Sequence, residues 1–437
     1  MAIQIHDRKL PISPDEVQVL LQRETDTFGT FFNLDRILYH EARYSIYARS
    51  LYPEFRAMAG LPYLTASQRN AVSEAFTHRF NVPAHYLQDK YGTVRFDKAT
   101  VSKLLQMDIN EDAKYFLRLF QKISAADYMV SYFGQYRDLP ISKMEDCDGQ
   151  RMVVAHPVWN KLSTSRFSAS KPSLQNINRD ICDIYTAPKG WQMVFSDSGQ
   201  IEPRITYSHF IQDALITHLI KTYDDAYYGL LHYISLSKEE EAEARTRLET
   251  VKPHEVTDEM KEKRRRLKVL GLAGNYGSVN LSAVDPELGP LYTEKIVNHP
   301  LRKRWEQKVT EAIRNGDDRF YGYFGTPIKP EANVKYRPGS SGWSGHLLRC
   351  GINNPVQTTA AELMCFSVYN SMRLLKHDDH IGAYKHDEGM FYVRDERVEE
   401  LAPKLRECLS YEVDGWIPIG SDLHIGRKES PYAPTLL

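Results

Sequence analysis

Two aspartates that lie far apart in the sequence each follow a predicted strand. Asp197 ends a strand-like run that begins at Trp191, and Asp387 lies at the tip of a predicted hairpin over Ile381–Val393. Two carboxylates on neighbouring strand ends can share a pair of Mg²⁺ ions, which stabilise the attacking and leaving oxygens in phosphoryl transfer. An aspartate at a strand end is more often a turn or cap residue, so the flanking residues must decide between the two interpretations.

A basic run lies between these two aspartates. Six positive charges and one negative charge fall within residues 261–268. Residues spaced by four form one stripe on a predicted helix, namely Arg264, Lys268, Leu272 and Tyr276. Such a stripe can meet phosphate at one end and a base at the other, whereas a basic run alone is more often a solvated helix face.

Three glycines, Gly271, Gly274 and Gly277, occur on the same predicted helix. A glycine inside a helix costs roughly 0.5–1 kcal/mol relative to alanine, so packing alone does not favour them. Close approach of a substrate or template would explain these glycines, and a locally broken helix is the alternative.

The composition sets wider limits. The 437 residues, 42% hydrophobic and 26% charged, are enough for two or three domains with a large core. The net charge of -1 means that any nucleic-acid binding must rest on local patches. The five cysteines are scattered singly, which favours reduced thiols over a zinc site or disulfides. No apolar run reaches about 18 residues and no secretory signal is visible, so we expect a cytoplasmic protein without a membrane partner, in a cellular nucleoid or a virus-infected host.

The elements that must position these residues predict a mixed α+β fold. In order, we expect mostly helix over 12–140, a turn at 146–150, a strand over 151–157, a strand over 191–197, helices over 205–280 with a solvated acidic helix at 238–249, a helix that starts at Pro355, the hairpin at 381–393 and a final strand over Trp416–Ile419.

Five blocks resemble motifs of the family A DNA polymerases, the bacterial DNA polymerase I type. Residues Ser196–Arg204 resemble motif A, Asp-Tyr-Ser-Gln-Ile-Glu-Leu-Arg, and His386-Asp387-Glu388 resembles motif C. Arg264-x-x-x-Lys268 with Tyr276-Gly277 has the spacing of motif B, the helix that grips the incoming nucleotide. Two supporting blocks, Thr164–Ile177 and Arg349–Ala361, are similar to a primer-binding block and to a minor-groove helix. Each block is weak alone, but all five occur in the family's order over roughly residues 140–425.

The resemblance implies a right-hand polymerase fold with an antiparallel palm sheet, helical fingers and a mostly helical thumb. The implied regions are a thumb-like helical region over 1–140, a first palm part over 141–210 with motif A, fingers over 211–345 with the motif B helix at about 261–277, and a second palm part over 346–437 with motif C.

The resemblance also implies roles for single residues. The catalytic acids would be Asp197, Asp387 and the auxiliary Glu388, with two Mg²⁺ ions, or Mn²⁺ as a substitute, on Asp197, Asp387 and the Ser198 carbonyl. The nucleotide would be bound by Arg264, Lys268, Leu272, Tyr276, Glu202 and Gln200. The primer and template would be bound by Arg166, Gln175, Asn176, Gly277, Arg349, Asn353, Gln357 and His386.

Several positions depart from the family's pattern. Ser198-Gly199 replaces Tyr-Ser, and Gly271-Leu272 replaces an Asn-Phe pair whose ring packs beside the nucleotide sugar. Asp225-Ala226-Tyr227 aligns with an Asp-x-His segment that contributes to triphosphate binding, so Tyr227 would make a different contact or none.

The resemblance predicts a template-directed DNA polymerase, a nucleotidyltransferase that adds deoxynucleotides to a primer 3′ end. Primer-template DNA and deoxynucleoside triphosphates would be its partners, and replication accessory proteins stay open. Glu202 and Tyr276 would form a wall below the nucleotide C2′ that excludes a ribose hydroxyl. No exonuclease motif is visible, so we expect no proofreading. The alternatives are an RNA-templated or RNA-synthesising polymerase of this fold, or a catalytically silent nucleic-acid-binding relative.

Overall fold

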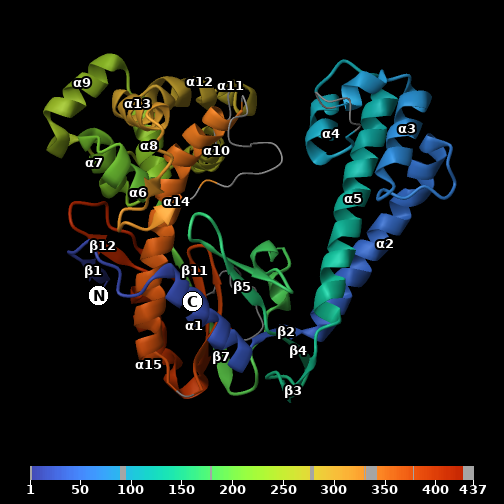
Figure 1. Ribbon diagram of the computed structural model, residues 1–437, viewed down its shortest axis with the longest axis horizontal. Helices are drawn as coiled ribbons and strands as arrows, with labels where there is room; N and C mark the ends of the chain where they lie inside the picture. The colour runs from blue at the N-terminus through green and yellow to red at the C-terminus, as the bar shows by residue number, and fades with distance from the viewer. Residues whose placement is uncertain are drawn as a thin grey trace. The chain divides into compact units, whose positions relative to one another are not determined.

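The computed structural model describes residues 2–88, 95–177, 180–275, 280–328, 330, 342–376 and 378–426. The chain forms two compact units (Figure 1). The large unit contains Met1–Thr30, His156–Arg179 and Gly190–Leu437, and the small unit contains Phe31–Ala155 and Asp180–Lys189. The polar residues singled out in the sequence lie in the large unit.

A four-stranded antiparallel sheet lies at the centre of the large unit. Its order is β10 (His380–Lys385), β11 (Glu388–Arg394), β7 (Trp191–Ser198) and β13 (Ser421–Gly426). The middle of β11, Met390 to Val393, is buried at every position, as expected for a strand covered on both faces. Helix α15 (Val398–Glu407) packs on β7 and β13, while α1 (Pro14–Thr27) packs on β10.

The helical part of the large unit holds its own apolar core. Its elements are α6 (Ile201–Ile205), η4 (Thr206–Phe210), α7 (Ala214–Tyr223), α8 (Ala226–Ser235), α9 (Lys238–Thr246), η5 (Leu248–Thr250), α10 (Asp258–Asn275), α11 (Leu281–Val284), α12 (Leu288–Tyr292), η6 (Thr293–Val297), α13 (Pro300–Arg314) and α14 (Trp343–Leu374). Leu267 and Leu270 anchor α10 in this core and are completely buried. The helix therefore presents Lys268 and Leu272, which are exposed, on a different face.

Short strands complete the large unit. They are β1 (Ile3–Ile5), parallel to β12 (Tyr411–Val413), the antiparallel pair β5 (Val158–Lys161) and β6 (Phe167–Ser170), and the pair β8 (Phe320–Tyr321) and β9 (Pro327–Ile328). The short helix η2 (Leu174–Asn176) follows β6.

The small unit is built on two long helices that pack along each other, α2 (Leu34–Ala59) and α5 (Glu111–Arg137) (Figure 1). Its other elements are α3 (Arg69–Phe80), η1 (Ala84–Leu87), α4 (Lys98–Leu105), η3 (Cys182–Ile184) and the sheet β2 (Thr30–Asn33), β4 (Arg151–Ala155), β3 (Ile141–Glu145). Asn33 and Asn110 cap the two long helices, and stacked Phe55 and Phe116 join them, with ring centroids 4.8 Å apart.

The mixed α+β class, the hairpin and the strand that ends near Asp197 are confirmed. The turn at 146–150 is also confirmed, because Asp146 accepts hydrogen bonds from the backbone N–H groups of Asp148 and Gln150. All five cysteines are free thiols.

Two predicted elements are wrong. Residues Trp416–Ile419 form no strand, because Pro418 has no N–H to donate and only Ile419 forms an isolated bridge, with Tyr411. Pro355 lies inside α14 instead of at a helix start. Buried positions on both sides of it, such as Leu347 and Leu363, hold the helix together across the missing hydrogen bond.

The small unit differs from the predicted thumb-like region 1–140 at both ends. Residues 1–30 belong to the large unit, where β1 pairs with β12 across some four hundred positions of sequence. Residues 141–155 instead belong to the small unit through the β2-β4-β3 sheet. The further division of the large unit into palm and fingers stays a prediction.

Candidate active site

The pairing of β7 with β11 brings the two predicted catalytic aspartates together. In this antiparallel ladder Glu388 lies opposite Asp197, and the Ser198 N–H donates a hydrogen bond to the Asp387 carbonyl oxygen at 2.9 Å. The adjacency of Asp197 and Asp387 that the sequence predicts is therefore present. His386 sits in the hairpin turn with a φ of 60°, a left-handed backbone conformation that is strained for a residue other than glycine. This conformation turns the chain directly before Asp387.

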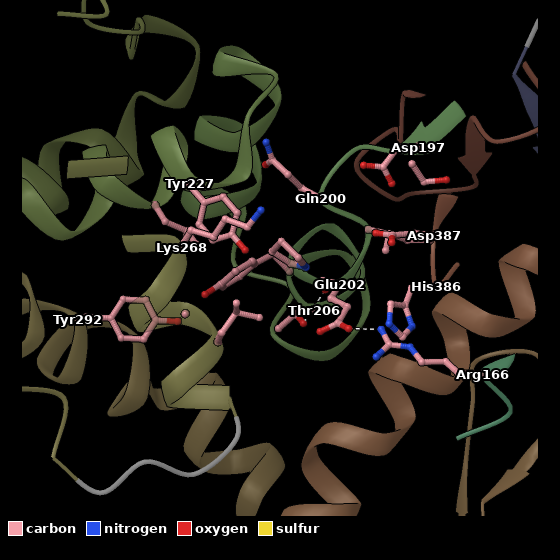
Figure 2. Close-up of a pocket in the computed structure, with 17 residues that line it drawn as sticks. Arg166, Asp197, Gln200, Glu202, Thr206, Tyr227, Lys268, Tyr292, His386 and Asp387 are labelled. Carbon is pink, nitrogen blue, oxygen red and sulfur yellow. Dashed lines mark hydrogen bonds and ion pairs between the residues drawn. The ribbon is translucent and has the colours of Figure 1, made fainter. Parts of the chain in front are cut away.

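A cavity of about 360 Å³ opens beside these two aspartates (Figure 2). Nine predicted site residues line it, namely Arg166, Asp197, Ser198, Gln200, Glu202, Lys268, Leu272, His386 and Asp387. Tyr207 and Tyr292, which the sequence did not mark as site residues, line it as well, as does Tyr227, for which the sequence left a contact open. The cavity thus joins acidic groups from the sheet, basic groups from two other segments and aromatic rings from the helical part.

The carboxylates at the sheet end repel one another. Burial raises the pKa of Asp197, and the charges of Asp387, Glu388 and Asp422 raise it further, against the opposing charge of Lys268. Burial also raises the pKa of Asp387, while the nearby Arg166 lowers it. The protein therefore holds more negative charge here than its own cations neutralise.

This charge imbalance tests whether the site fits a divalent cation. The donors of Asp197 and Asp387 are hard oxygen atoms, which Mg²⁺ prefers, and the uncompensated charge favours a cation. Among the described residues no group of three or more His, Cys, Asp or Glu side chains is arranged to hold a metal ion. Two carboxylates still fit Mg²⁺, because this ion commonly keeps several waters and takes further ligands from substrate phosphates.

Arg166 and Glu202 form an ion pair on the wall of the cavity, and both side chains are largely buried (Figure 2). His386 lies beside them, and its pKa is lowered by burial and by the charges of Arg166 and Lys385. His386 is therefore neutral near pH 7, able to donate or accept a hydrogen bond without adding charge.

Gly274 of α10 has a different cause from the two that the sequence suggests, whereas Gly271 lines the cavity. The helix is continuous through Gly271 and Gly274, so it is not broken there. A Cβ on Gly274 would lie 3.1 Å from the ring of Tyr292, tighter than ordinary packing. Packing of a tyrosine against the helix, not approach of a substrate, accounts for Gly274.

Other predicted site residues lie outside the cavity lining. Arg264 is ion-paired with Asp225, and Glu388 faces Asp197 across the sheet. Asn353 and Gln357 of α14 line a smaller neighbouring cavity that shares Glu202 with the first.

Gln175 uses its amide on the backbone of β6, accepting from the Ala169 N–H at 2.8 Å. Asn176 ends η2, and Arg349 lies in the first half of α14. Tyr276 and Gly277 lie outside the described residues.

Sequence reasoning also missed Asp422, which lies directly opposite Asp197 in the β7–β13 ladder. An alternating apolar pattern in Leu423 and Ile425 could have placed this aspartate on a strand, but the register with β7 is not visible in the sequence. Tyr292 carries no local signal, because only the packing of α12 against α10 brings its ring to the cavity.

The fold of the chain is similar to that of a solved polymerase domain. A solved structure described as the POL domain of Pol1 from M. smegmatis in complex with DNA primer-template and dNTP superimposes with a TM-score of 0.73. The match covers 94% of this chain and 69% of that chain at 18% sequence identity. The chain therefore has the same fold as this POL domain.

Curated relatives agree in sequence. DNA polymerase I of Synechocystis sp. is 23% identical over 387 residues, which cover 82% of this chain and 38% of that protein. DNA polymerase I of Chloroflexus aurantiacus is 26% identical over 314 residues, 67% of this chain and 31% of that protein. No family model matches the sequence. The chain spans about a third to two-fifths of the length of these relatives.

No helix among the described residues is long and apolar enough to cross a membrane.

Proposed function

We propose that this chain is a template-directed DNA polymerase that adds deoxynucleotides to a primer 3′ end. The observation that carries the proposal is the cavity in which Asp197 and Asp387, from motifs 190 positions apart, face Lys268 of α10. A ligand that presents both a divalent cation and a polyphosphate is complementary to this arrangement. The partners proposed for the site are therefore primer-template DNA and deoxynucleoside triphosphates.

Asp197 and Asp387 would hold the divalent ions, Mg²⁺ or Mn²⁺, with help from the Ser198 carbonyl. When bound, these ions supply charge stabilisation for the oxygens that attack and leave at the α-phosphate, as family A polymerases generally require. Glu388 lies next to this pair in the ladder, where it adds negative charge that strengthens cation binding.

Lys268 would meet the triphosphate, because its exposed ammonium borders the cavity opposite the aspartates. Preorganised cations stabilise charge that develops in phosphoryl transfer. The primer 3′ hydroxyl then attacks the α-phosphate and pyrophosphate leaves. His386 and Arg166, on the same side as Asp387, would contact the primer strand.

Glu202 would select the sugar. Its carboxylate is fixed by Arg166, so it cannot easily move away from a ribose 2′ hydroxyl in the cavity. Such a hydroxyl would clash and would leave a buried polar group mispaired, which favours deoxynucleotides. Leu272 borders the same cavity without the aromatic ring that the family usually has there.

A primer-extension assay tests the proposal. The purified chain with Mg²⁺ and a primed DNA template should extend the primer with deoxynucleotides and not with ribonucleotides. Extension on an RNA template or with ribonucleotides would support the RNA-directed alternative, and duplex binding without extension would support a silent relative. A mismatched primer end should persist, since we propose no proofreading activity; its efficient removal would contradict that part.

A further inference from the structure

One carboxylate joins three segments around the proposed nucleotide site. Asp225 is the N-cap residue of α8 and accepts the Tyr228 N–H through Oδ1 at 2.9 Å. Its Oδ2 accepts from Nε and Nη2 of Arg264 in α10, at 2.9 and 2.5 Å, and from the Gln200 amide at 2.5 Å. Gln200 in turn accepts the Ala226 N–H at 2.6 Å, so the contact is reciprocal.

The three segments all border the cavity. Gln200 lies in the turn between β7 and α6, three residues after Asp197, and has a φ of 55°. Tyr227 lines the cavity, as does Lys268, one helical turn beyond Arg264. Asp225 therefore connects the turn that follows one catalytic aspartate to the helix that carries the basic stripe.

Asp225 fixes the direction of the Arg264 side chain. A guanidinium carries five N–H donors in a planar fork, and the pair with Asp225 uses only the Nε and Nη2 edge. The rings of Tyr227 and Tyr228 flank the guanidinium carbon at 5.7 and 5.3 Å and restrict its rotation. The Nη1 edge takes no part in the Asp225 pair, and an oxyanion can bind there in a fixed geometry.

We propose that Asp225 is a positioning residue for the incoming nucleotide, which aims Arg264 at the triphosphate and ties it to the Gln200 turn beside Asp197. This inference rests on the proposed polymerase function. Asp225 acts through Arg264 and Gln200 and does not itself touch the nucleotide. A cation held in its binding orientation loses less conformational freedom on binding, so the pair with Asp225 lowers the nucleotide concentration needed for half-maximal rate.

The same helix offers a matched control. Arg266 donates Nε and Nη2 to Asp285 at 2.7 and 2.6 Å, and Asp285 also accepts the backbone N–H groups of Glu287 and Leu288. The pair thus repeats the geometry of Arg264 with Asp225. Neither arginine lines the cavity, but Asp225 also binds Gln200, which does, whereas Arg266, Glu287 and Leu288, which bind Asp285, lie outside the lining. A substitution of Asp285 reports what the loss of such a pair does to α10 itself.

The test compares Asp225→Ser with Asp285→Ser in single-nucleotide primer extension. Serine retains an oxygen for the helix cap but is too short to hold the arginine. Asp225→Ser should raise the KM for each of the four deoxynucleotides by about tenfold or more, with kcat and duplex binding changed much less. Asp285→Ser should leave this KM within about twofold of the wild type, although both variants lower the unfolding temperature.

A double-mutant cycle decides whether Asp225 acts through Arg264. In an Arg264→Ala background, Asp225→Ser should change the KM by less than about twofold. Asp225→Asn keeps the length of the side chain and loses its charge, so its KM should lie between those of the wild type and Asp225→Ser. This variant replaces Asp225→Ser in the test if the serine variant does not fold. The inference would be overturned if Asp225→Ser left the KM of the otherwise wild-type chain unchanged, or if it had its full effect in the Arg264→Ala background. A lower KM in Asp225→Ser would also overturn it, because Asp225 would then compete with the nucleotide for Arg264. A wild-type chain that extends no primer would instead contradict the proposed function itself.

Discussion

In the helical part of the large unit, Asp213 and Glu241 lie beside cations. Asp213 caps α7 and binds Arg245 at 2.8 Å, and Glu241 binds Arg245 and Lys295 at 2.8 and 2.5 Å. Burial alone would raise the pKa of Asp213, but hydrogen bonds from His299, the Ile216 N–H and Arg245 lower it to about 2. This network stabilises the charged forms and holds helices together.

Acidic side chains at the end of the central sheet instead lie close to one another. Asp197 faces Asp387, Glu388 and Asp422, and its pKa is raised instead of lowered. A fold that pairs its buried charges in one region and clusters like charges in another keeps the second for a ligand. Both regions contain several carboxylates, but it is the sheet end, where carboxylates lie beside one another, that favours a bound cation.

Removing one of the clustered carboxylates at the sheet end should have the largest effect, and this effect should fall on activity and not on stability. Asp387→Ala should lower the rate of primer extension by roughly 10³-fold or more, because an oxygen donor for the proposed metal ions is lost. Duplex binding, measured by fluorescence anisotropy, should change little, since phosphate contacts elsewhere supply most of it. Extension at the wild-type rate would defeat the assignment of the site.

Removing one paired carboxylate should instead act on stability. Asp213→Ala breaks the cap of α7 and leaves Arg245 and His299 without their buried partner. The free energy of unfolding should fall by roughly 3 kcal/mol in urea denaturation. The matched Asp387→Asn variant should lose no stability without metal, because it relieves repulsion; a similar loss in both variants would remove the contrast between the two regions.

The two regions should also respond to pH with opposite signs. The folded-state pKa of Asp197 is raised above its ordinary value of 3.8, so the folded form binds more protons and stability declines as the pH rises through the raised pKa. Asp213, with a pKa lowered to about 2, adds stability above pH 4 that is lost as the pH falls toward 2.

Thermal unfolding in EDTA should show these signs. Between pH 5 and pH 8 the wild type should lose stability relative to Asp197→Asn, and added Mg²⁺ should reduce that loss. Equal pH profiles for the two proteins, with and without Mg²⁺, would contradict the predicted shift of Asp197.

The smallest expected effect concerns the exposed stripe of α10. Leu272 lines the cavity where the resemblance implies an aromatic ring, so Leu272→Phe should change the ratio of dideoxynucleotide to deoxynucleotide incorporation severalfold. Leu267→Phe is not a suitable comparison, because Leu267 is fully buried, whereas Val269→Phe alters an exposed position outside the cavity lining. An unchanged ratio for Leu272→Phe would show that this position does not sense the sugar.

The sequence itself determined the local parts of the site. Apolar alternation placed Asp197 and Asp387 at strand ends, and four-residue spacing placed Lys268 and Leu272 on one helix face. The order of five motif blocks then indicated a polymerase fold, which the structural comparison bears out. Each of these signals comes from residues that are close together in the sequence, so it can be recognised before the fold is known.

Only the tertiary structure decided which of these residues meet other groups. The register of β13 brings Asp422 opposite Asp197, the packing of α12 brings Tyr292 to the cavity, and Asp225 reaches Arg264 from another helix. Neither strand register nor helix packing is encoded by nearby residues, because each depends on the burial of surfaces that are distant in sequence. The packing of the chain thus decided which carboxylates lie beside cations and which lie beside one another.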